Sequence, residues 1–388
     1  MLSLAVNWEV YRRTHSAAML GLIGLFGAIP VILFAIPAGH LADRLSRRGI
    51  MLVTQFISVC TSLALAAVSW TQADIRLLYA LLFVAGTTRA FGWAARSSLL
   101  LQLVPTEAFG NAVTWNSSAF ESASVTGPAL GGFLVKQFGF APVYMLDAVC
   151  QLGFFILLIF IKTRKNADAA PEQQRGKKPA GLDELFSGLR FVWKTKIILA
   201  TITLDLFAVL FGGATALLPI FADQILHCDA TGLGWLRAAP SMGAILMALF
   251  LAHRPPLRRA GRAMVMAVAG FGLAWALFGL SRSFWISMPL LILSGACDNV
   301  SVVVRHTLVQ LLTPNVMRGR VSAVNNVFIG SSNDLGAFES GMTAAWFGPV
   351  LSIVGGGLAT VLIVSAVAKK WPQVLRLGSF TSIKTPAT

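Results

Sequence analysis

The chain has 388 residues, of which 56% are hydrophobic and only 12% are charged. Soluble proteins carry about 25% charged residues, so this composition excludes an ordinary soluble protein and indicates a chain that crosses a membrane many times. The formal net charge is +15. The basic residues gather between apolar runs, which is a pattern of membrane topology, and we expect no nucleic-acid partner.

The first part of the chain predicts one short helix and five membrane-length helices. Residues 1–11 are apolar, but at 1.5 Å per residue they cover only about half of a bilayer's hydrocarbon core. We expect them to be the outer end of a first helix whose beginning is missing, through a late start or a truncation. The spanning helices that follow are predicted at about 17–40, 50–70, 77–99, 111–135 and 141–161.

A charged stretch, Gly39 to Arg48, separates the first two of these spanning helices. Arginines in a short loop resist translocation, so we expect this loop in the cytoplasm. Gly39 would allow close approach of another helix, and Asp43 would accept hydrogen bonds from a helix N-terminus near 319–322. The side chains predicted to bind lipid phosphates or to close the ring of helix ends are Arg44, Arg47 and Arg48.

The composition changes at residues 162–179 to Lys, Arg, Gln, Asp, Glu and Pro, which predicts a flexible cytoplasmic linker. Apolar residues then recur at helical spacing over 182–193, indicating an amphipathic helix on the membrane surface, with a stripe buried in the core as the alternative. Six more spanning helices are predicted, at about 197–217, 231–252, 263–281, 285–311, 321–345 and 350–368. The predicted domains are a helical bundle at 1–161, a linker at 162–196, a second bundle at 197–369 and a cytoplasmic tail at 370–388.

The pattern G-x-x-x-D-R-x-x-R-R over residues 39–48 resembles the signature loop between helices 2 and 3 of the major facilitator superfamily. The corresponding loop of the second half, Arg254 to Arg262, keeps the arginines but lacks the acid. A basic loop after the second helix of each half fits the internal repeat expected of that superfamily. The predicted fold class is therefore all-α: a polytopic membrane protein of two pseudo-symmetric six-helix bundles, the first helix truncated.

Two further resemblances narrow the family. Gly127, Pro128, Gly131 and Gly132 resemble the helix 5 motif of antiporter-type members, although small residues also form ordinary packing faces. The stretches 297–321 and 325–341 look like the enterobactin-exporter branch, also called the transmembrane secretion effector group. Members of that branch export siderophores, drugs or unknown compounds.

Charged side chains inside a bilayer cost a few kcal/mol each, so each one is a candidate for coupling or substrate binding. Arg89 and Glu121 fall at matching depth on adjacent antiparallel helices, and we predict that they pair, with Glu121 as the first candidate for the proton site. Asp298 and Arg305 share one helix face. Any of these could instead be a structural ion pair. The candidate set is Arg89, Glu121, Asp205, Asp298, Arg305, Asn333, Asp334 and Glu339.

The chain has no Gly-rich loop ending in Gly-Lys-Ser/Thr, so ATP is not expected to drive transport. Its four cysteines are scattered, and we expect no metal and no cofactor. The sequence predicts a secondary transporter, not an enzyme, that exports an amphiphilic small molecule by proton antiport and alternating access. Two alternatives stay open: a flippase for lysophospholipids or lipids, and a membrane scaffold or sensor without transport.

The predicted partners are a small-molecule substrate, protons and membrane lipids. We expect a monomer, inserted as a multi-pass protein in the inner (cytoplasmic) membrane of the cell.

Overall fold

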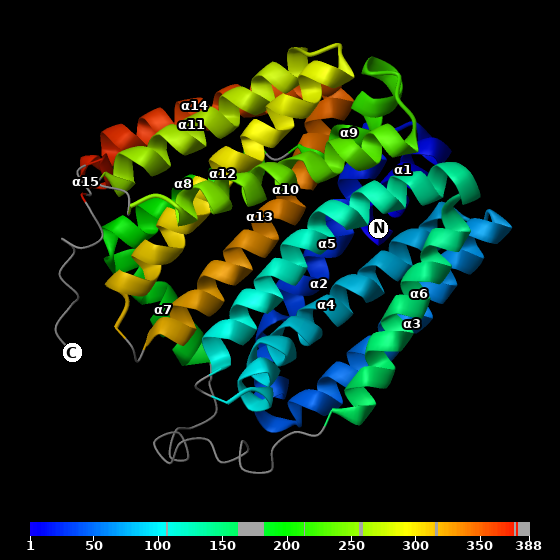
Figure 1. Ribbon diagram of the computed structural model, residues 1–388, viewed down its shortest axis with the longest axis horizontal. Helices are drawn as coiled ribbons and strands as arrows, with labels where there is room; N and C mark the ends of the chain where they lie inside the picture. Colours follow the sequence, from blue (N-terminus) through cyan, green and yellow to red (C-terminus); the bar gives the residue numbers. More distant parts are fainter. Residues whose placement is uncertain are drawn as a thin grey trace.

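The computed structural model describes residues 1–105, 108–161, 182–212, 214–255, 259–314, 317–375 and 378. Over these ranges the chain is helical, with no strand. Nine of the described helices are long and apolar enough to cross a membrane. Figure 1 shows two groups of long helices that lean together at one end and separate toward the other.

The first group of helices, here called the first bundle, comprises α1 (Leu2–Thr14), α2 (Ala17–Arg44), α3 (Arg47–Thr71), α4 (Ile75–Leu103), α5 (Phe109–Phe138) and α6 (Phe140–Phe160). The second bundle comprises α8 (Lys196–Gly212), α9 (Leu218–Ile220), α10 (Ala230–Ala252), α11 (Ala260–Leu280), α12 (Phe284–Leu312), α13 (Arg318–Phe347) and α14 (Pro349–Lys370). Every helix predicted from the apolar runs is present. Most extend a few residues past the predicted ends, because apolar content does not report polar terminal turns.

The two bundles repeat one packing plan. In the first bundle α2 packs on α4, and α3 packs on α4 and α6; in the second, α10 packs on α12, and α11 packs on α12 and α14. Between the bundles, α2 contacts α13 and α5 contacts α10. If α8 counts as the first helix of the second bundle, the second helix of each bundle meets the fifth helix of the other. A pseudo-two-fold axis between the bundles produces this exchange.

The two ends of the molecule are named here by their loops. The basic end contains the turns between α2 and α3 and between α12 and α13. The distal end contains the turns between α1 and α2, between α5 and α6, and before α10 (Figure 1). The positive-inside rule predicts that the basic end faces the cytoplasm.

The predicted loop from Gly39 to Arg48 is much shorter in the structure. Helix α2 continues to Arg44, and only two residues separate it from α3. The second of them, Ser46, caps α3: its hydroxyl accepts a hydrogen bond from the Gly49 N–H at 3.2 Å. Gly39 and Asp43 therefore belong to the last turns of α2. Charged residues are common both in the last turn of a helix and in the loop after it. The sequence therefore could not show that these residues belong to α2.

Arg48 has a different partner from the one predicted. Its guanidinium donates to the backbone oxygens of Leu158, at 3.0 Å, and Ile159, at 2.5 Å, in the last turn of α6. A cation at a helix C-terminus satisfies free carbonyls and complements the helix dipole. In this conformation Arg48 ties α3 to α6, whereas the side chains of Asp43 and Arg44 lie outside what the structure describes.

Two other segments differ from expectation. The predicted helix at 197–217 ends at Gly212, and the chain continues through a 3-10 turn, α9 and a π turn as far as Ile225. Helix α7 (Leu182–Lys194) is present, but Val192 is buried with Ile198 and Val321. Part of the apolar stripe is thus covered by the second bundle, the alternative left open for this helix. The linker predicted at 162–179 lies outside the described residues.

Candidate functional site

At the distal end the two bundles touch through small residues. A Cβ built at Gly21 of α2 would lie 3.0 Å from the Cα of Gly341 on α13. A Cβ at Gly234 of α10 would lie 2.6 Å from the backbone oxygen of Pro128 on α5. The second distance is shorter than real Cβ contacts and the first is at their lower limit, so a larger residue at either position would push the two bundles apart.

Toward the basic end the same helix faces lose contact. Gly39 lies 18 residues after Gly21, or five turns at 3.6 residues per turn, so both glycines face the same way. Gly330 precedes Gly341 by 11 residues, or about three turns. At Gly39 and at Gly330, a built Cβ would meet no atom of the described residues within 4 Å. The bundles are therefore packed together at the distal end and separated at the basic end.

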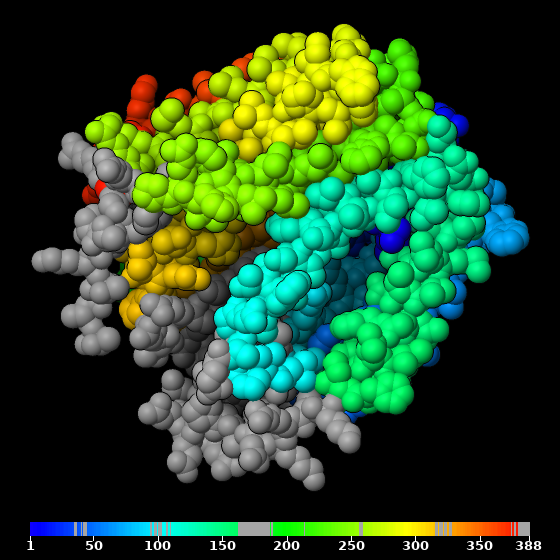
Figure 2. Space-filling view, viewed as in Figure 1, coloured from blue at the N-terminus to red at the C-terminus, as the bar shows by residue number. Residues whose placement is uncertain are grey.

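The surface shows the same opening. In Figure 2, α5 and α10 meet near the distal end and part toward the basic end. A hollow separates α5 from α6, with α4 at its floor (Figures 1 and 2). Several large apolar side chains on the basic-end halves of α4 and α5 are exposed: Trp93, Val113, Trp115 and Phe120.

An ion pair joins the bundles where the opening ends. The guanidinium of Arg89 on α4 pairs with the carboxylate of Asp334 on α13 and also donates to the backbone oxygen of Gly27, at 3.2 Å. Arg89 is the fifteenth of 29 residues of its helix and Asp334 the seventeenth of 30, so the pair lies near mid-membrane. The Arg89 side chain keeps 47% of its exposure. A cross-bundle pair that remains this exposed can be reached by a ligand or a proton.

The predicted partner of Arg89 was wrong for this conformation. Arg89 pairs with Asp334, 245 residues away, and not with Glu121. Glu121 is half-buried on α5, and no ion pair to it is found among the described residues. The sequence gives the depth of a residue along its helix but not the neighbouring helix that its side chain faces. Asp334, at a similar depth in the other bundle, was therefore not considered as a partner of Arg89.

Arg305 does not pair with Asp298, the acidic residue on its own helix face. Its guanidinium pairs with the carboxylate of Asp205 on α8. Both side chains are buried, at 3% and 8% exposure, among the apolar residues that join α8, α11 and α12. Asp298 lies seven residues earlier on α12 and is not part of this pair. The Arg305–Asp205 pair therefore lies inside the second bundle and fits the structural alternative.

The predicted antiporter motif packs against two helices. Gly127 and Gly131 face Met1, the residue that precedes α1: built Cβ atoms there would lie 3.3 Å from the Met1 nitrogen and 3.1 Å from the Met1 Cα. Gly132 faces α10, where a Cβ would collide with the Ala230 oxygen. The motif thus brings α5 against α1 within one bundle and against α10 across the bundle boundary.

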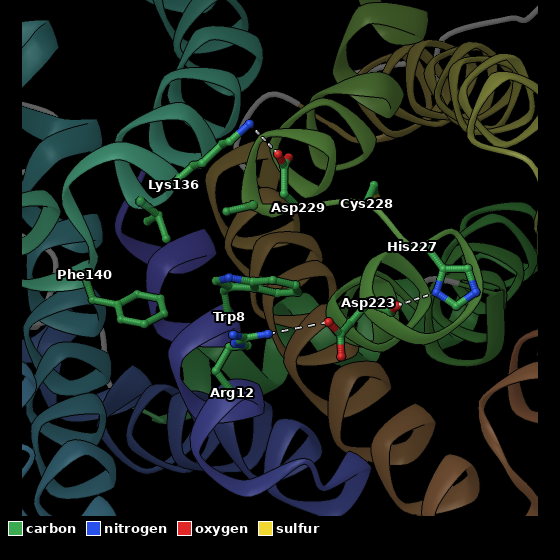
Figure 3. A pocket seen from close by; sticks show the side chains of 10 residues that line it. Trp8, Arg12, Lys136, Phe140, Asp223, His227, Cys228 and Asp229 are labelled. Carbon is green, nitrogen blue, oxygen red and sulfur yellow. Dashed lines mark hydrogen bonds and ion pairs between the residues drawn. The ribbon is translucent and has the colours of Figure 1, made fainter.

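A cavity of about 590 Å³ opens between the bundles at the distal end. Figure 3 shows its charged residues. Lys136 at the end of α5 pairs with Asp229 at 2.7 Å, and Arg12 of α1 lies 3.6 Å from Asp223. Asp223 also accepts a hydrogen bond from the Tyr11 hydroxyl at 2.9 Å. Each of these contacts joins the first bundle to the second. We call the pairs Lys136–Asp229 and Arg12–Asp223 the distal clasp.

Electrostatics at the distal clasp follow from these contacts. The hydrogen bond from the Lys136 ammonium, with a further one from the Gly232 N–H, lowers the pKa of Asp229. Burial of Cys228, reinforced by the charge of Asp229, raises its thiol pKa to about 11. The thiol is therefore almost wholly protonated at neutral pH, which makes it a slow nucleophile in this conformation.

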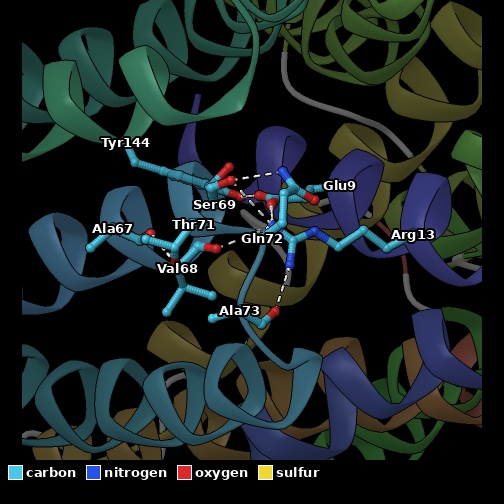
Figure 4. Close-up of polar contacts among 9 residues, drawn as sticks. All are labelled: Glu9, Arg13, Ala67, Val68, Ser69, Thr71, Gln72, Ala73 and Tyr144. Carbon is cyan, nitrogen blue, oxygen red and sulfur yellow. Dashed lines mark hydrogen bonds and ion pairs between the residues drawn. The ribbon is translucent and has the colours of Figure 1, made fainter.

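Sequence analysis missed a buried network at the start of the chain. The fully buried Glu9 accepts a hydrogen bond from the Tyr144 hydroxyl of α6, at 2.6 Å, and pairs with Arg13 one turn later (Figure 4). Arg13 also donates to the Ala73 oxygen at 3.0 Å. The network fixes α1 to the distal ends of α3 and α6. An acid and a base four residues apart in an apolar helix were the available signal.

Of the remaining predicted residues, Asn333 is exposed next to Asp334, and its amide donates to the Ile329 oxygen at 2.8 Å. Glu339 lies apart from the Arg89–Asp334 pair, in a second cavity of the second bundle. The candidate residues thus do not form one site. Only Arg89 and Asp334 meet between the bundles.

Comparison with known proteins identifies the family. Residues 1–380 match the family model described as transmembrane secretion effector. The chain belongs to the transmembrane secretion effector family. Curated relatives include the enterobactin exporter EntS of Shigella dysenteriae serotype 1 (strain Sd197) and that of Escherichia coli O139:H28 (strain E24377A / ETEC). Each is 26% identical over 369 residues, which cover 94% of this chain and 86% of the relative.

Solved structures place this member of the family in the major facilitator fold. A bacterial homologue of the human lysosomal transporter Spinster, in an inward-facing and unoccupied conformation, superposes with a TM-score of 0.75 at 15% identity. The match covers 100% of this chain and 95% of that one. A D-xylose-proton symporter gives a TM-score of 0.70 at 15% identity, covering 95% and 92%. The chain is thus a multi-pass helical transporter of the major facilitator superfamily, related to the enterobactin exporter.

Proposed function

We propose that this transporter exports an amphiphilic small molecule across the inner membrane by proton antiport and alternating access. With the basic end in the cytoplasm, the conformation described above faces inward, closed at the distal clasp and open as far as Arg89. The substrate enters from the cytoplasm and binds beside the Arg89–Asp334 pair. The exposed aromatic residues of α4 and α5 provide apolar contact area for its hydrophobic part.

The observation that carries this proposal is the Arg89–Asp334 pair itself. It connects the two bundles near mid-membrane and remains partly exposed to the open side. Protonation of Asp334 would break the pair and free Arg89, which changes the energy of separating the bundles. Asp334 therefore replaces Glu121 as our first candidate for the proton site, and Glu121 becomes the second.

The test uses everted membrane vesicles from a Gram-negative host that lacks its own enterobactin exporter. Enterobactin and ethidium are the probes, and an imposed proton gradient drives their uptake. We expect Asp334→Asn to abolish gradient-driven uptake while permitting downhill exchange of the same probe. If Asp334→Asn keeps full gradient-driven uptake, the proton site lies elsewhere. If the wild-type chain transports neither enterobactin nor ethidium, and releases no protons when they are added, export of amphiphilic small molecules is refuted.

A second candidate function is favoured by the hollow between α5 and α6, which opens on the side of the molecule (Figure 2). Such a lateral opening would admit a lysophospholipid from the bilayer. Fluorescent lysophosphatidylethanolamine in proteoliposomes distinguishes the two functions. Flipping of this lipid without movement of enterobactin or ethidium would favour the flippase.

A further inference from the structure

A second cavity lies within the second bundle, away from the cross-bundle pair. It has a volume of about 420 Å³, within the range of small-molecule sites, and lies between α8, α13 and α14. Its wall is mostly apolar, and its mouth is formed by Phe347 and Leu351, which are 64% and 65% exposed. We call this cavity the distal groove. Phe347 and Leu351 lie at the distal ends of α13 and α14, at the level of the lipid headgroups, so a headgroup of the bilayer can enter between them.

The depth of the distal groove follows from the length of α13. Its 30 residues extend about 45 Å, whereas the hydrocarbon core is about 30 Å thick, so each end projects by roughly 7 Å. Glu339 precedes the last residue of α13, Phe347, by eight residues, or about 12 Å. Its carboxylate therefore lies roughly 5 Å inside the distal hydrocarbon boundary, near the level where lipid headgroups join their chains.

The polar groups of the groove leave one charge without a partner. The hydroxyls of Thr343 and Ser352 lie 2.7 Å apart, and their two protons are shared among this contact and the backbone oxygens of Glu339, 2.9 Å from Thr343, and Ser340, 3.1 Å from Ser352. From the described residues, the Glu339 carboxylate receives a single long bond, 3.4 Å, from the neighbouring Ser340 hydroxyl. No ion pair of Glu339 is found in the part of the chain that the structure describes. A carboxylate at this depth is costly unless a cation or several donors reach it.

We propose that the distal groove binds a membrane lipid of the distal leaflet whose headgroup ends in a primary ammonium, as in phosphatidylethanolamine. The ammonium donates to the Glu339 carboxylate, and an acyl chain follows the exposed face of α14 from Gly355 toward mid-membrane, past Leu358 and Leu362. Charge complementarity selects this headgroup over an anionic one, because a second negative charge beside Glu339 would be repelled. A trimethylated ammonium has the charge but no N–H donor, so it binds less well.

Native mass spectrometry of the full chain released from lipid nanodiscs tests this proposal. The nanodiscs contain palmitoyl-oleoyl phosphatidylethanolamine and phosphatidylglycerol in equal amounts, or phosphatidylcholine in place of the ethanolamine lipid. We expect the wild-type chain to retain one phosphatidylethanolamine preferentially. Loss of the charge in Glu339→Gln is expected to lower the retained ethanolamine-to-glycerol ratio at least about tenfold, the scale of a charge-assisted hydrogen bond.

A second variant blocks the groove and keeps the charge. A Cβ built at Gly355, which lines the groove, meets no described atom within 4 Å, so Gly355→Leu adds a side chain to open space and raises helix propensity. Its matched control is Gly153→Leu on α6, where a Cβ is equally free. We expect Gly355→Leu to lose the bound lipid and Gly153→Leu to keep it. Equal phosphatidylethanolamine retention by wild type, Glu339→Gln and Gly355→Leu, or equal retention of phosphatidylglycerol by the wild type, overturns the proposal.

Discussion

Arg305 and Asp205 are two charges in a place where the surrounding side chains are apolar. The desolvation of such a pair is large, and its mutual attraction repays it only when geometry and further hydrogen bonds are favourable. The Nε atom of Arg305 is buried and has no hydrogen-bond partner among the described residues. The pair is thus a weak contributor when intact, yet costly when half of it is removed.

We therefore expect Asp205→Asn to destabilise the protein by about 3–5 kcal/mol, because it leaves the Arg305 charge buried and unpaired. The double variant Asp205→Leu with Arg305→Met is expected to be close to the wild type, since apolar residues of similar volume avoid the desolvation cost. Unfolding in an SDS titration measures both. A single variant as stable as the wild type would show that Arg305 finds another partner or is not buried in the membrane.

Proton coupling can be separated from stability in the same variants. If the Arg305–Asp205 pair is structural, the folded double variant retains gradient-driven uptake in everted vesicles. If the double variant folds but loses only the response to the gradient, Asp205 takes part in coupling, and the structural assignment is wrong. The matched comparison is Asp334→Asn, which is expected to fold and to lose the gradient response.

At the scale of helices, the sequence predicted positions well and partners poorly. Apolar runs of membrane length gave every spanning helix, and the resemblance at residues 39–48 gave the superfamily. The pairing of Arg89 with Asp334 was out of reach, because helix periodicity fixes the depth of a residue and the relative faces on one helix, but not which helices become neighbours. The sequence could not predict which end of the molecule is open for the same reason. Gly39 and Gly21 share one face of α2, yet only Gly21 packs against the other bundle.

This difference between Gly21 and Gly39 leads to a prediction about α2 and α13. In Gly341→Leu the new side chain would collide with Gly21, so we expect the distal end to open. In Gly39→Leu the new side chain meets free space in the present conformation. It would, however, obstruct closure of the basic end, where this face of α2 would have to pack against the other bundle. We expect that variant to remain open at the basic end and closed at the distal end.

Cys228 reports the state of the distal end. The reporter chain carries Cys60→Ser, Cys150→Ser and Cys297→Ser, so Cys228 is its only thiol. Cys228 lines the cavity between the bundles, so we expect opening to remove part of the burial that raises its thiol pKa to about 11. A return toward the ordinary value would increase the thiolate fraction, and with it maleimide labelling, by up to about 100-fold at pH 8. We expect faster labelling in Gly341→Leu and no increase in Gly39→Leu or in the control Gly153→Leu. Unchanged labelling in Gly341→Leu would contradict the packing argument.

At the scale of the whole molecule, the ion pairs of the distal clasp contribute little free energy to closure of the distal end. Lys136 and Asp229 are 50% and 47% exposed, and exposed ion pairs contribute about 0–1 kcal/mol each. Closure of the distal end therefore rests mainly on the glycine contacts of α2 with α13 and of α5 with α10. In the proposed alternating-access cycle the distal end opens once per turnover, and ion pairs that break at little cost would favour that step.

Asp229 allows the ion pair to be tested without disturbing the helix. Its carboxylate caps α10 by accepting from the Gly232 N–H at 3.0 Å, and asparagine is an equally good cap. We expect Asp229→Asn to shift the distal end toward the open state by up to about fivefold, as does Lys136→Gln. Electron–electron distance measurements between spin labels at Thr71→Cys and Arg282→Cys, in a chain without other cysteines, measure the open fraction.

The pH dependence of the distal clasp follows from the lowered pKa of Asp229. A carboxylate whose pKa is lower in the closed state favours closure at pH values above its open-state pKa, and this contribution is lost as the pH falls through the closed-state value. The ordinary pKa of an aspartate is already acidic and the closed state lowers it further, so Asp229 stays charged between pH 5 and 8. We expect Asp229→Asn to displace the open fraction by a constant factor over that range without changing its slope. A slope present in the wild type and absent in Asp229→Asn would make Asp229 a proton sensor, contrary to this assignment.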